Sequence, residues 1–121
     1  MSLDMYDNIA KCTDHLSIIC HNLARAAGWW DKERPVAECL CLIHSEISEA
    51  LEGYRTDKVD DHLPDHQSLT VELADAIIRI CDLAGGLNLP IGEALAEKLC
   101  YNQMRADHKR ENRAKPGGKK I

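Results

Sequence analysis

Aromatic side chains are scarce in this chain, and phenylalanine is absent altogether. The 121 residues include only two tryptophans and three tyrosines, although 45% of the residues are hydrophobic. The core therefore has to be aliphatic, built from leucine, isoleucine, alanine and cysteine. Because sheets favour aromatic and β-branched residues, this composition favours packed helices over sheet.

Long hydrophobic runs are also missing. No stretch approaches the roughly 18 apolar residues of a membrane-spanning helix. The N-terminal sequence "MSLDMYDNIAKC" lacks the basic-then-apolar order of a signal peptide. These absences predict a cytoplasmic protein that does not engage a membrane.

The six cysteines do not suggest a disulfide framework. Five of them fall inside apolar helical patterns of a chain without an export signal: Cys12, Cys20, Cys39, Cys81 and Cys100. In that setting we expect reduced thiols that belong to the core. Cys39 and Cys41 are two residues apart, so on a helix they point to different sides and make a poor metal clip.

Charge is distributed unevenly, although the net charge is only −5. Residues 98–121 carry eight Lys and Arg residues against Asp107 and Glu111, whereas residues 1–97 carry seven against eighteen acidic residues. An acidic body with a basic tail suits a metal ion and a phosphate better than a nucleic-acid backbone. A solvated charged tail on an acidic protein explains the same asymmetry.

Hydrophobic periodicity predicts four helices and no convincing strand. The first helix ends at Gly28, and the second runs from near Pro35 to about Arg55. Their expected core residues are Ile9, Cys12, Leu16, Ile19, Cys20, Leu23 and Ala27 in the first, and Leu40, Ile43, Ile47, Leu51 and Tyr54 in the second.

The polar stretch 56–67 contains proline, shows no period and is predicted to be a loop. The third helix is expected to start at Ser68, as its N-cap, and to end at the Gly85-Gly86 pair. The fourth is expected from Pro90 to about Arg113.

Consecutive helices with these connections can pack antiparallel, which predicts a single all-α domain over residues 1–121, close to a four-helix bundle. The sequence "AKPGGKK" cannot remain helical, so residues 110–121 are expected to form a basic tail with room to be flexible.

Two pairs of acidic residues are placed for metal binding. Glu46 and Glu49 are three residues apart on the second helix, and Glu72 and Asp75 repeat that spacing on the third. Residues three apart share one side of a helix, and both pairs lie beside apolar residues. Four converging carboxylates would repel one another unless a cation compensated them.

Oxygen ligands favour Mg²⁺ for such a site, with Mn²⁺ as a substitute. The alternative is that both pairs are solvent-facing stripes of amphipathic helices. On the third helix, Arg79 and Asp82 are also three apart, and we expect them to form a local ion pair.

The fourth helix adds a set of polar residues: Lys98, Asn102, Arg105 and Lys109. Their spacings of four, three and four predict one stripe on a helix, which beside the four carboxylates would suit a metal-bound polyphosphate. A solvated basic face is the alternative. Trp29 and Trp30 could stack on a nucleobase or pack in the core or an interface, and His15 could line the same pocket.

These motifs in this order resemble the all-α nucleoside triphosphate pyrophosphohydrolases of the MazG-like family. The family signature is E-x-x-E, a variable gap and E-x-x-D, which reads "EISE" at 46–49 and "ELAD" at 72–75. "KLCYNQMR" is similar to the family's Lys, Asn and Arg helix, and "PGGKK" to its Gly-Lys tail. The likeness covers roughly residues 28–120, with Ser45 standing where many members have another glutamate.

The resemblance implies an all-helical fold, Mg²⁺ dependence, homodimers or homotetramers, and cleavage of a nucleotide to its monophosphate and pyrophosphate. Under this reading Glu49, ahead of Glu46, is the general base. Lys98 and Arg105 stabilise charge on the phosphates, and Asn102 hydrogen-bonds phosphate or sugar. A phosphoribosyl-ATP pyrophosphohydrolase and a non-catalytic helical interaction module are the alternatives.

Overall fold

The computed structural model describes all 121 residues and contains helices but no strands. The elements are α1 (Leu3–Ala26), α2 (Val36–Arg55), α3 (Ser68–Gly86), α4 (Ile91–Met104), the 3-10 turn η1 (Ala106–His108) and α5 (Arg110–Arg113). The prediction of an all-α protein is therefore confirmed. None of these helices combines the length and the apolarity needed to cross a membrane.

The helices fall into two compact units. The hairpin unit comprises residues 15–89, and the terminal unit comprises residues 1–14 together with residues 90–121. Helix α1 begins in the terminal unit and ends in the hairpin unit. The single-domain assignment for residues 1–121 stays a prediction.

The predicted ends of the first three helices agree with the structure, apart from one cap. Gly28 follows α1 with a φ of +89°, a backbone conformation that glycine adopts at no steric cost. Pro35 directly precedes α2. Ser68 is not the N-cap of α3, which is Gln67. The reason is that Ser68 is buried against α2, so its hydroxyl faces a neighbouring helix instead of the helix end.

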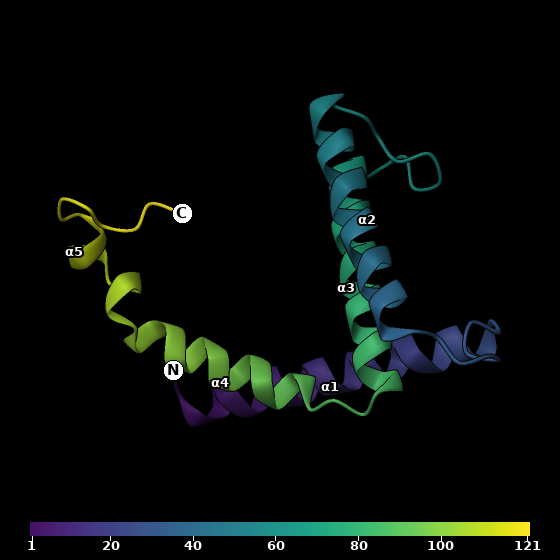
Figure 1. Ribbon diagram of the computed structural model, residues 1–121, viewed down its shortest axis with the longest axis horizontal. Coiled ribbons are helices and arrows are strands. Elements are labelled where there is room, and N and C mark those ends of the chain that lie inside the picture. Colours follow the sequence, from purple (N-terminus) through teal and green to yellow (C-terminus); the bar gives the residue numbers. More distant parts are fainter. The chain divides into compact units, whose positions relative to one another are not determined.

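Helices α2 and α3 lie side by side as an antiparallel hairpin joined by the loop 56–67, as predicted (Figure 1). The buried residues of α2 are Cys39, Glu46, Ala50 and Gly53. Most of these are small, and the two helices approach closely at Gly53, where an added Cβ would lie 2.8 Å from Ser68 Cβ. The hairpin is therefore held by close contact between small residues.

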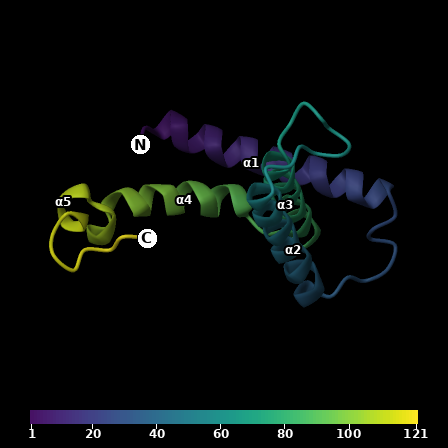
Figure 2. The same cartoon turned by 90° about the horizontal axis from the view of Figure 1, so that it is seen from above.

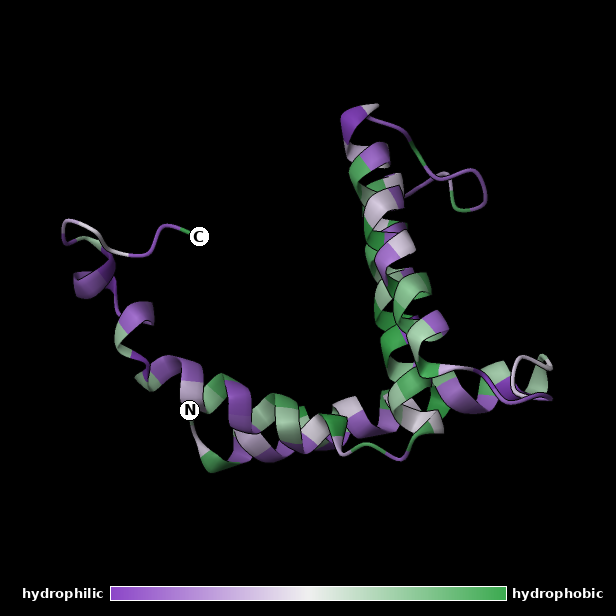
Figure 3. Cartoon of the chain, in the orientation of Figure 1, coloured by the Kyte–Doolittle hydropathy of each residue, from purple (hydrophilic) through white to green (hydrophobic).

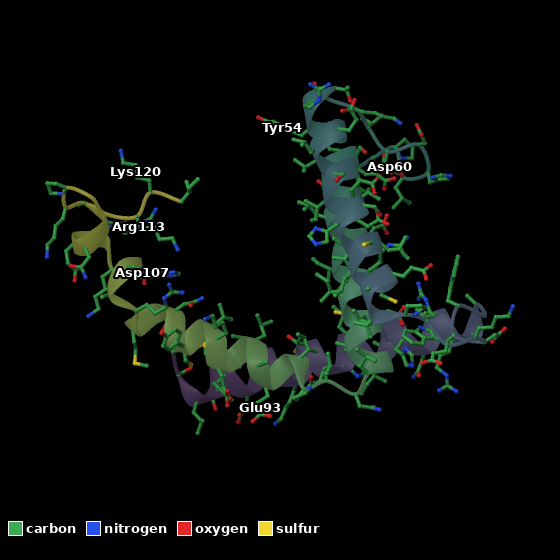
Figure 4. The ribbon with its side chains drawn as sticks, viewed as in Figure 1. Tyr54, Asp60, Glu93, Asp107, Arg113 and Lys120 are labelled. Atoms are coloured by element: carbon green, nitrogen blue, oxygen red, sulfur yellow. The ribbon has the colours of Figure 1, made fainter.

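The predicted core stripe of α2 is wrong. Four of its five members are between 48% and 69% exposed: Leu40, Ile47, Leu51 and Tyr54. Hydrophobic residues run along both hairpin helices (Figure 3), and Tyr54 projects away from the hairpin (Figure 4). The large aliphatic residues mark a second apolar face, whereas the small residues allow α3 to approach.

The second half of α1 packs against α3 in the hairpin unit. The Ser17 hydroxyl donates to the Cys81 carbonyl over 2.7 Å, and both Cys20 and Cys81 are buried. All six thiols are free, as expected. The predicted core stripe of α1 is wrong for Cys12, which is exposed, and for Leu16, Ile19 and Leu23, which are between 40% and 67% exposed.

The first half of α1 and α4 lie side by side in the terminal unit (Figure 2). The Gly92 amide donates to Asp14 Oδ1 over 2.8 Å, and an added Cβ at Gly92 would collide with the Ala10 carbonyl. Cys12, midway between Ala10 and Asp14, points to the opposite side of α1, which accounts for its exposure.

Helix α4 ends at Met104 and does not continue to Arg113 as predicted. Arg105 is extended, with φ −65° and ψ 133°, and its guanidinium donates to both carboxylate oxygens of Asp107 at 3.0 and 2.6 Å. Residues two apart point to opposite sides of a helix, so this pair forms only where the helix has ended.

The predicted basic tail contains α5 and then a turn that follows it. Arg113 donates from Nε and Nη2 to the carbonyls of Lys119 and Lys120, at 3.1 and 2.9 Å. Arg113 and Lys120 accordingly lie close to one another (Figure 4). The end of the chain therefore folds back on α5.

Gly53→Ala tests the close approach of α2 and α3. Alanine normally stabilises a helix relative to glycine. At this position the added methyl overlaps Ser68, so we expect the free energy of unfolding to fall by about 1 to 3 kcal/mol. Ser48→Ala, an exposed control on the same helix, should be neutral or stabilising in thermal melting. A higher melting temperature for Gly53→Ala would contradict the close packing.

Candidate metal centre

A buried carboxylate marks the centre of the hairpin. Glu46 is only 6% exposed, because α2 turns it toward α3 with the small residues of the same face. The Arg79 guanidinium, from α3, donates through Nε to Glu46 Oε1 over 2.6 Å. A buried ionised carboxylate needs such a partner, since desolvation without one costs several kcal/mol.

Three carboxylates from the two helices converge beside this ion pair. Oxygen atoms of Glu46, Glu72 and Asp75 all lie within 4.8 Å of one another. Glu72 and Asp75 are half-buried. Glu49 is exposed and is not one of the three, although its interactions with Glu46 and Glu72 shift its pKa. The predicted set of four is thus brought together, with three members as one cluster and Glu49 at its edge.

Repulsion within the cluster shifts its proton affinities. Burial together with the neighbouring acidic groups raises the pKa of Glu72 to about 7. Burial and the Glu46 charge also raise the pKa of Asp75, to which the loop residue Asp60 contributes. The pKa of Glu49 is raised because its protonated form can donate to Glu46.

Glu46 differs from the rest of the cluster. Burial alone would raise its pKa, yet hydrogen bonds, first of all the one from Arg79, bring it below the ordinary value. One arginine thus compensates one of four negative charges. The donor set consists of oxygen atoms only, of the kind that hard divalent cations prefer. The cluster of Glu46, Glu72 and Asp75 could therefore hold a metal ion.

A cavity of about 600 Å³ adjoins the cluster within the hairpin unit, and Glu46 and Asp75 form part of its wall. The other polar lining residues are Arg34, Arg79 and Asp82. The remaining walls are apolar or aromatic: Leu16, Ile19, Cys20, Leu23, Ala24, Ala27, Trp29 and Ile78. The cavity is therefore apolar over most of its surface and acidic where it meets the cluster.

The two tryptophans have different environments. Trp29 is 66% exposed and lines the cavity. Trp30 donates from Nε1 to Asp82 over 2.8 Å, and its ring covers Gly86, where an added Cβ would lie 2.6 Å from Cη2. Both residues were predicted either to stack on a nucleobase or to pack. Trp29 is free to stack on a ligand, whereas the ring of Trp30 is engaged in packing.

The predicted ion pair between Arg79 and Asp82 is wrong. Arg79 pairs with Glu46, and Asp82 instead accepts from Trp30 and from His21, whose Nδ1 is 2.9 Å from Asp82 Oδ1. The side chain of Asp82 is turned toward α1 and the loop after it. Cross-helix partners therefore replace the local one.

The remaining predicted site residues lie elsewhere. His15 is exposed and does not line the cavity. The other four belong to the terminal unit: Lys98, Asn102, Arg105 and Lys109. Their prediction as one helical stripe is wrong, because α4 ends before Arg105. A role beside the carboxylates stays a prediction for all four.

Two of these residues have notable surroundings within the terminal unit. The ammonium of Lys98 lies 4.8 Å from the centre of the Tyr101 ring. The amide oxygen Oδ1 of Asn102 is buried and accepts no hydrogen bond. Asn102 therefore retains an unused acceptor.

Sequence reasoning missed Arg34 and the connection of Arg79 to the cluster. Arg79 follows Asp75 by four residues on α3, and this spacing is a signal that could have placed the two on one side. Arg34 lies between helices, where no periodicity indicates which way a side chain points.

No protein-family model matches the chain, and searches of curated proteins and of solved structures also find no match. The likeness to the MazG-like pyrophosphohydrolases stays a prediction carried by the residues of its motifs.

The raised pKa of Glu72 predicts how stability depends on pH without metal. Its pKa is about 7 in the folded chain against an ordinary value of 4.5, so the folded state binds more protons between these values. Glu72 therefore lowers the free energy of unfolding progressively as the pH rises from 4.5 to about 7, and this loss is complete above that range.

With EDTA present, melting should therefore occur at a higher temperature at pH 5.5 than at pH 8, and this difference should shrink in Glu72→Gln. A divalent cation added at pH 8 should raise the melting temperature of the parent more than that of the variant. Identical pH profiles for the two proteins would contradict the shifted carboxyl group.

Proposed function

We propose that this protein is a Mg²⁺-dependent nucleoside triphosphate pyrophosphohydrolase that converts (d)NTP to (d)NMP and pyrophosphate. The observation that carries the proposal is the shared wall between the carboxylate cluster and the cavity, to which both Glu46 and Asp75 belong. A nucleotide has the matching two-part chemistry, with a metal-binding triphosphate next to a largely apolar ring.

Three carboxylates would hold the cation, from Glu46 and from the E-x-x-D pair Glu72 and Asp75. Mg²⁺, or Mn²⁺ as a substitute, would neutralise the triphosphate and lower the pKa of a bound water when present. Arg79 keeps Glu46 ionised and in position, since its Nε is 2.6 Å from Glu46 Oε1.

Glu49 fits the role of general base better than Glu46 does. It is exposed and stands at the edge of the cluster, whereas Glu46 is buried and hydrogen-bonded to Arg79. A raised pKa makes the Glu49 carboxylate the stronger proton acceptor. Glu49 would take the proton of the attacking water as its oxygen bonds to the α-phosphorus, while the bond from that phosphorus to the bridging oxygen breaks and pyrophosphate leaves.

Trp29 would stack on the base inside the cavity, because its exposed ring forms part of the apolar wall. The resemblance to the MazG-like family gives Lys98 and Arg105 the role of stabilising charge on the phosphates, with Asn102 and Lys109 as further contacts. For Asn102, the unused amide oxygen supports a role as acceptor for a ligand hydroxyl.

A homodimer or homotetramer belongs to the same proposal. Each hairpin helix carries a row of exposed aliphatic residues; on α3 this row is Leu73, Ile77 and Ile80, each between 41% and 51% exposed. A monomer that exposed both rows would be prone to association. Two hairpins packed through these rows would complete a MazG-like four-helix bundle between copies.

Asp75→Asn tests the catalytic proposal. The amide preserves shape but removes a ligand charge and relieves repulsion, so thermal stability without metal should hold or rise. Release of pyrophosphate from a mixture of dNTPs in Mg²⁺ should become undetectable. Glu52→Gln, an exposed α2 control with 62% side-chain exposure, should retain parental turnover.

Turnover of Asp75→Asn within a few fold of the parent would remove this residue from the centre. Cleavage of phosphoribosyl-ATP alone would favour that narrower hydrolase. If the parent neither releases pyrophosphate nor binds a cation, the result favours a helical interaction module.

Leu51→Lys tests the oligomer. Leu51 is 60% exposed on the aliphatic face of α2, so a charge there costs a lone chain little but would be buried without a partner between copies. Sedimentation should give a dimer or tetramer for the parent and a shift to monomer for the variant. Glu52→Gln should assemble like the parent, and a parent that is monomeric at micromolar concentration would refute the assembly.

A further inference from the structure

One cation on the cavity wall has no role in the proposed chemistry. Arg34 lies in the segment between α1 and α2, and its side chain is 18% exposed. Its guanidinium carbon is 5.2 Å from the centre of the Trp30 ring and 6.0 Å from that of Trp29. Stacking contacts of this kind hold a planar guanidinium in a fixed orientation.

The hydrogen-bonding capacity of Arg34 is almost unused. Its single protein contact is from Nη1 to Asp82 Oδ2, at the long distance of 3.5 Å. A guanidinium has five N–H donors, and none of those on Arg34 is a buried donor lacking a partner. The free donors are thus accessible, and Arg34 lines the cavity.

Asp82 holds the Arg34 guanidinium and the Trp30 ring in place. Its other oxygen, Oδ1, accepts from Trp30 Nε1 at 2.8 Å and lies 2.9 Å from His21 Nδ1. Asp82 itself is only 8% exposed. The carboxylate therefore ties Arg34, the indole of Trp30 and α1 to α3, which orients the guanidinium before any ligand enters.

The two arginines of the cavity have separate tasks. Arg79 is the cation that hydrogen-bonds Glu46, whereas the carboxylate paired with Arg34 is Asp82, outside the cluster. Arg34 instead contacts Trp29, the exposed ring of the apolar wall. Free donors beside a stacking surface suit the edge of a planar ligand that carries acceptors.

We propose that Arg34 is a specificity-determining residue that donates hydrogen bonds to an exocyclic carbonyl oxygen of a nucleobase stacked on Trp29. The inference rests on the proposed nucleotide site. Guanine, cytosine, thymine and uracil all carry such an oxygen, whereas adenine carries an amino group that would face the donors of Arg34. The preferred substrates are accordingly nucleotides with a carbonyl-bearing base, and adenine nucleotides are disfavoured.

Binding without turnover tests this selectivity separately from catalysis. The probes are the α,β-methylene analogues of dGTP, dCTP, dTTP and dATP, which cannot be cleaved between those phosphates, titrated calorimetrically in Mg²⁺. The parent should bind each of the first three with an affinity at least about 10-fold higher than that for the dATP analogue. This is the discrimination expected from a hydrogen bond with a charged donor.

Arg34→Gln should bring the three carbonyl-bearing analogues to the affinity of the dATP analogue, which itself should change little. Lys32→Gln, an exposed change of the same charge two residues away, should bind all four like the parent. Arg34→Lys keeps the charge without the planar fork and should discriminate less than the parent, so it carries the test if the glutamine variant melts early.

Equal affinity of the parent for all four analogues, or no binding of any, overturns the inference. An equal loss for all four in Arg34→Gln also overturns it, since that result assigns Arg34 to the phosphates or to the fold. If the parent discriminates among the analogues as expected but releases no pyrophosphate from dNTPs, the assignment of Arg34 stands and the proposed hydrolysis fails.

Discussion

The pair of buried Glu46 and half-buried Arg79 is the interaction on which the rest of the site depends. Small residues at positions such as 50 and 53 let α2 approach α3, and this approach removes Glu46 from water. A charge so placed is tolerated only when it is matched, which Arg79 does at 2.6 Å. The same approach brings Glu72 and Asp75 against Glu46. The close helix packing therefore also causes the repulsion among the carboxylates.

The fold class and the extents of the first three helices could be predicted from the sequence, because local signals set them. Gly28 and Pro35 mark helix ends through backbone conformation alone. The Gly85-Gly86 pair lies at the end of α3, where His21 and Trp30 pack closely against it. The end of α4 could not be predicted, since it involves the side-chain pair of Arg105 and Asp107 and no glycine or proline. Hydrophobic periodicity does not indicate such a side-chain pair.

Convergence of the carboxylates was likewise predictable from two spacings of three, because equal spacing places each pair on one side of its helix. Which face of α2 meets α3 was not predictable. Hydrophobicity favoured the stripe containing Ile47 and Leu51, whereas the structure packs the face of Ala50 and Gly53. Two apolar faces on one helix require two partners, and a single sequence does not state which partner lies in the same chain.

The different surroundings of Trp29 and Trp30 give the protein two distinct intrinsic fluorophores. Excitation at the red edge of indole absorption, where tyrosine does not absorb, gives emission from these two tryptophans alone. Trp29, at 66% exposure, is open to aqueous quenchers and to any ring that enters the cavity. Trp30 is half-buried, hydrogen-bonded to Asp82 and packed on Gly86, and loses these contacts only when the hairpin unit opens. Quenching of the first indole and the spectral shift of the second therefore separate ligand entry from unfolding in a single unlabelled sample.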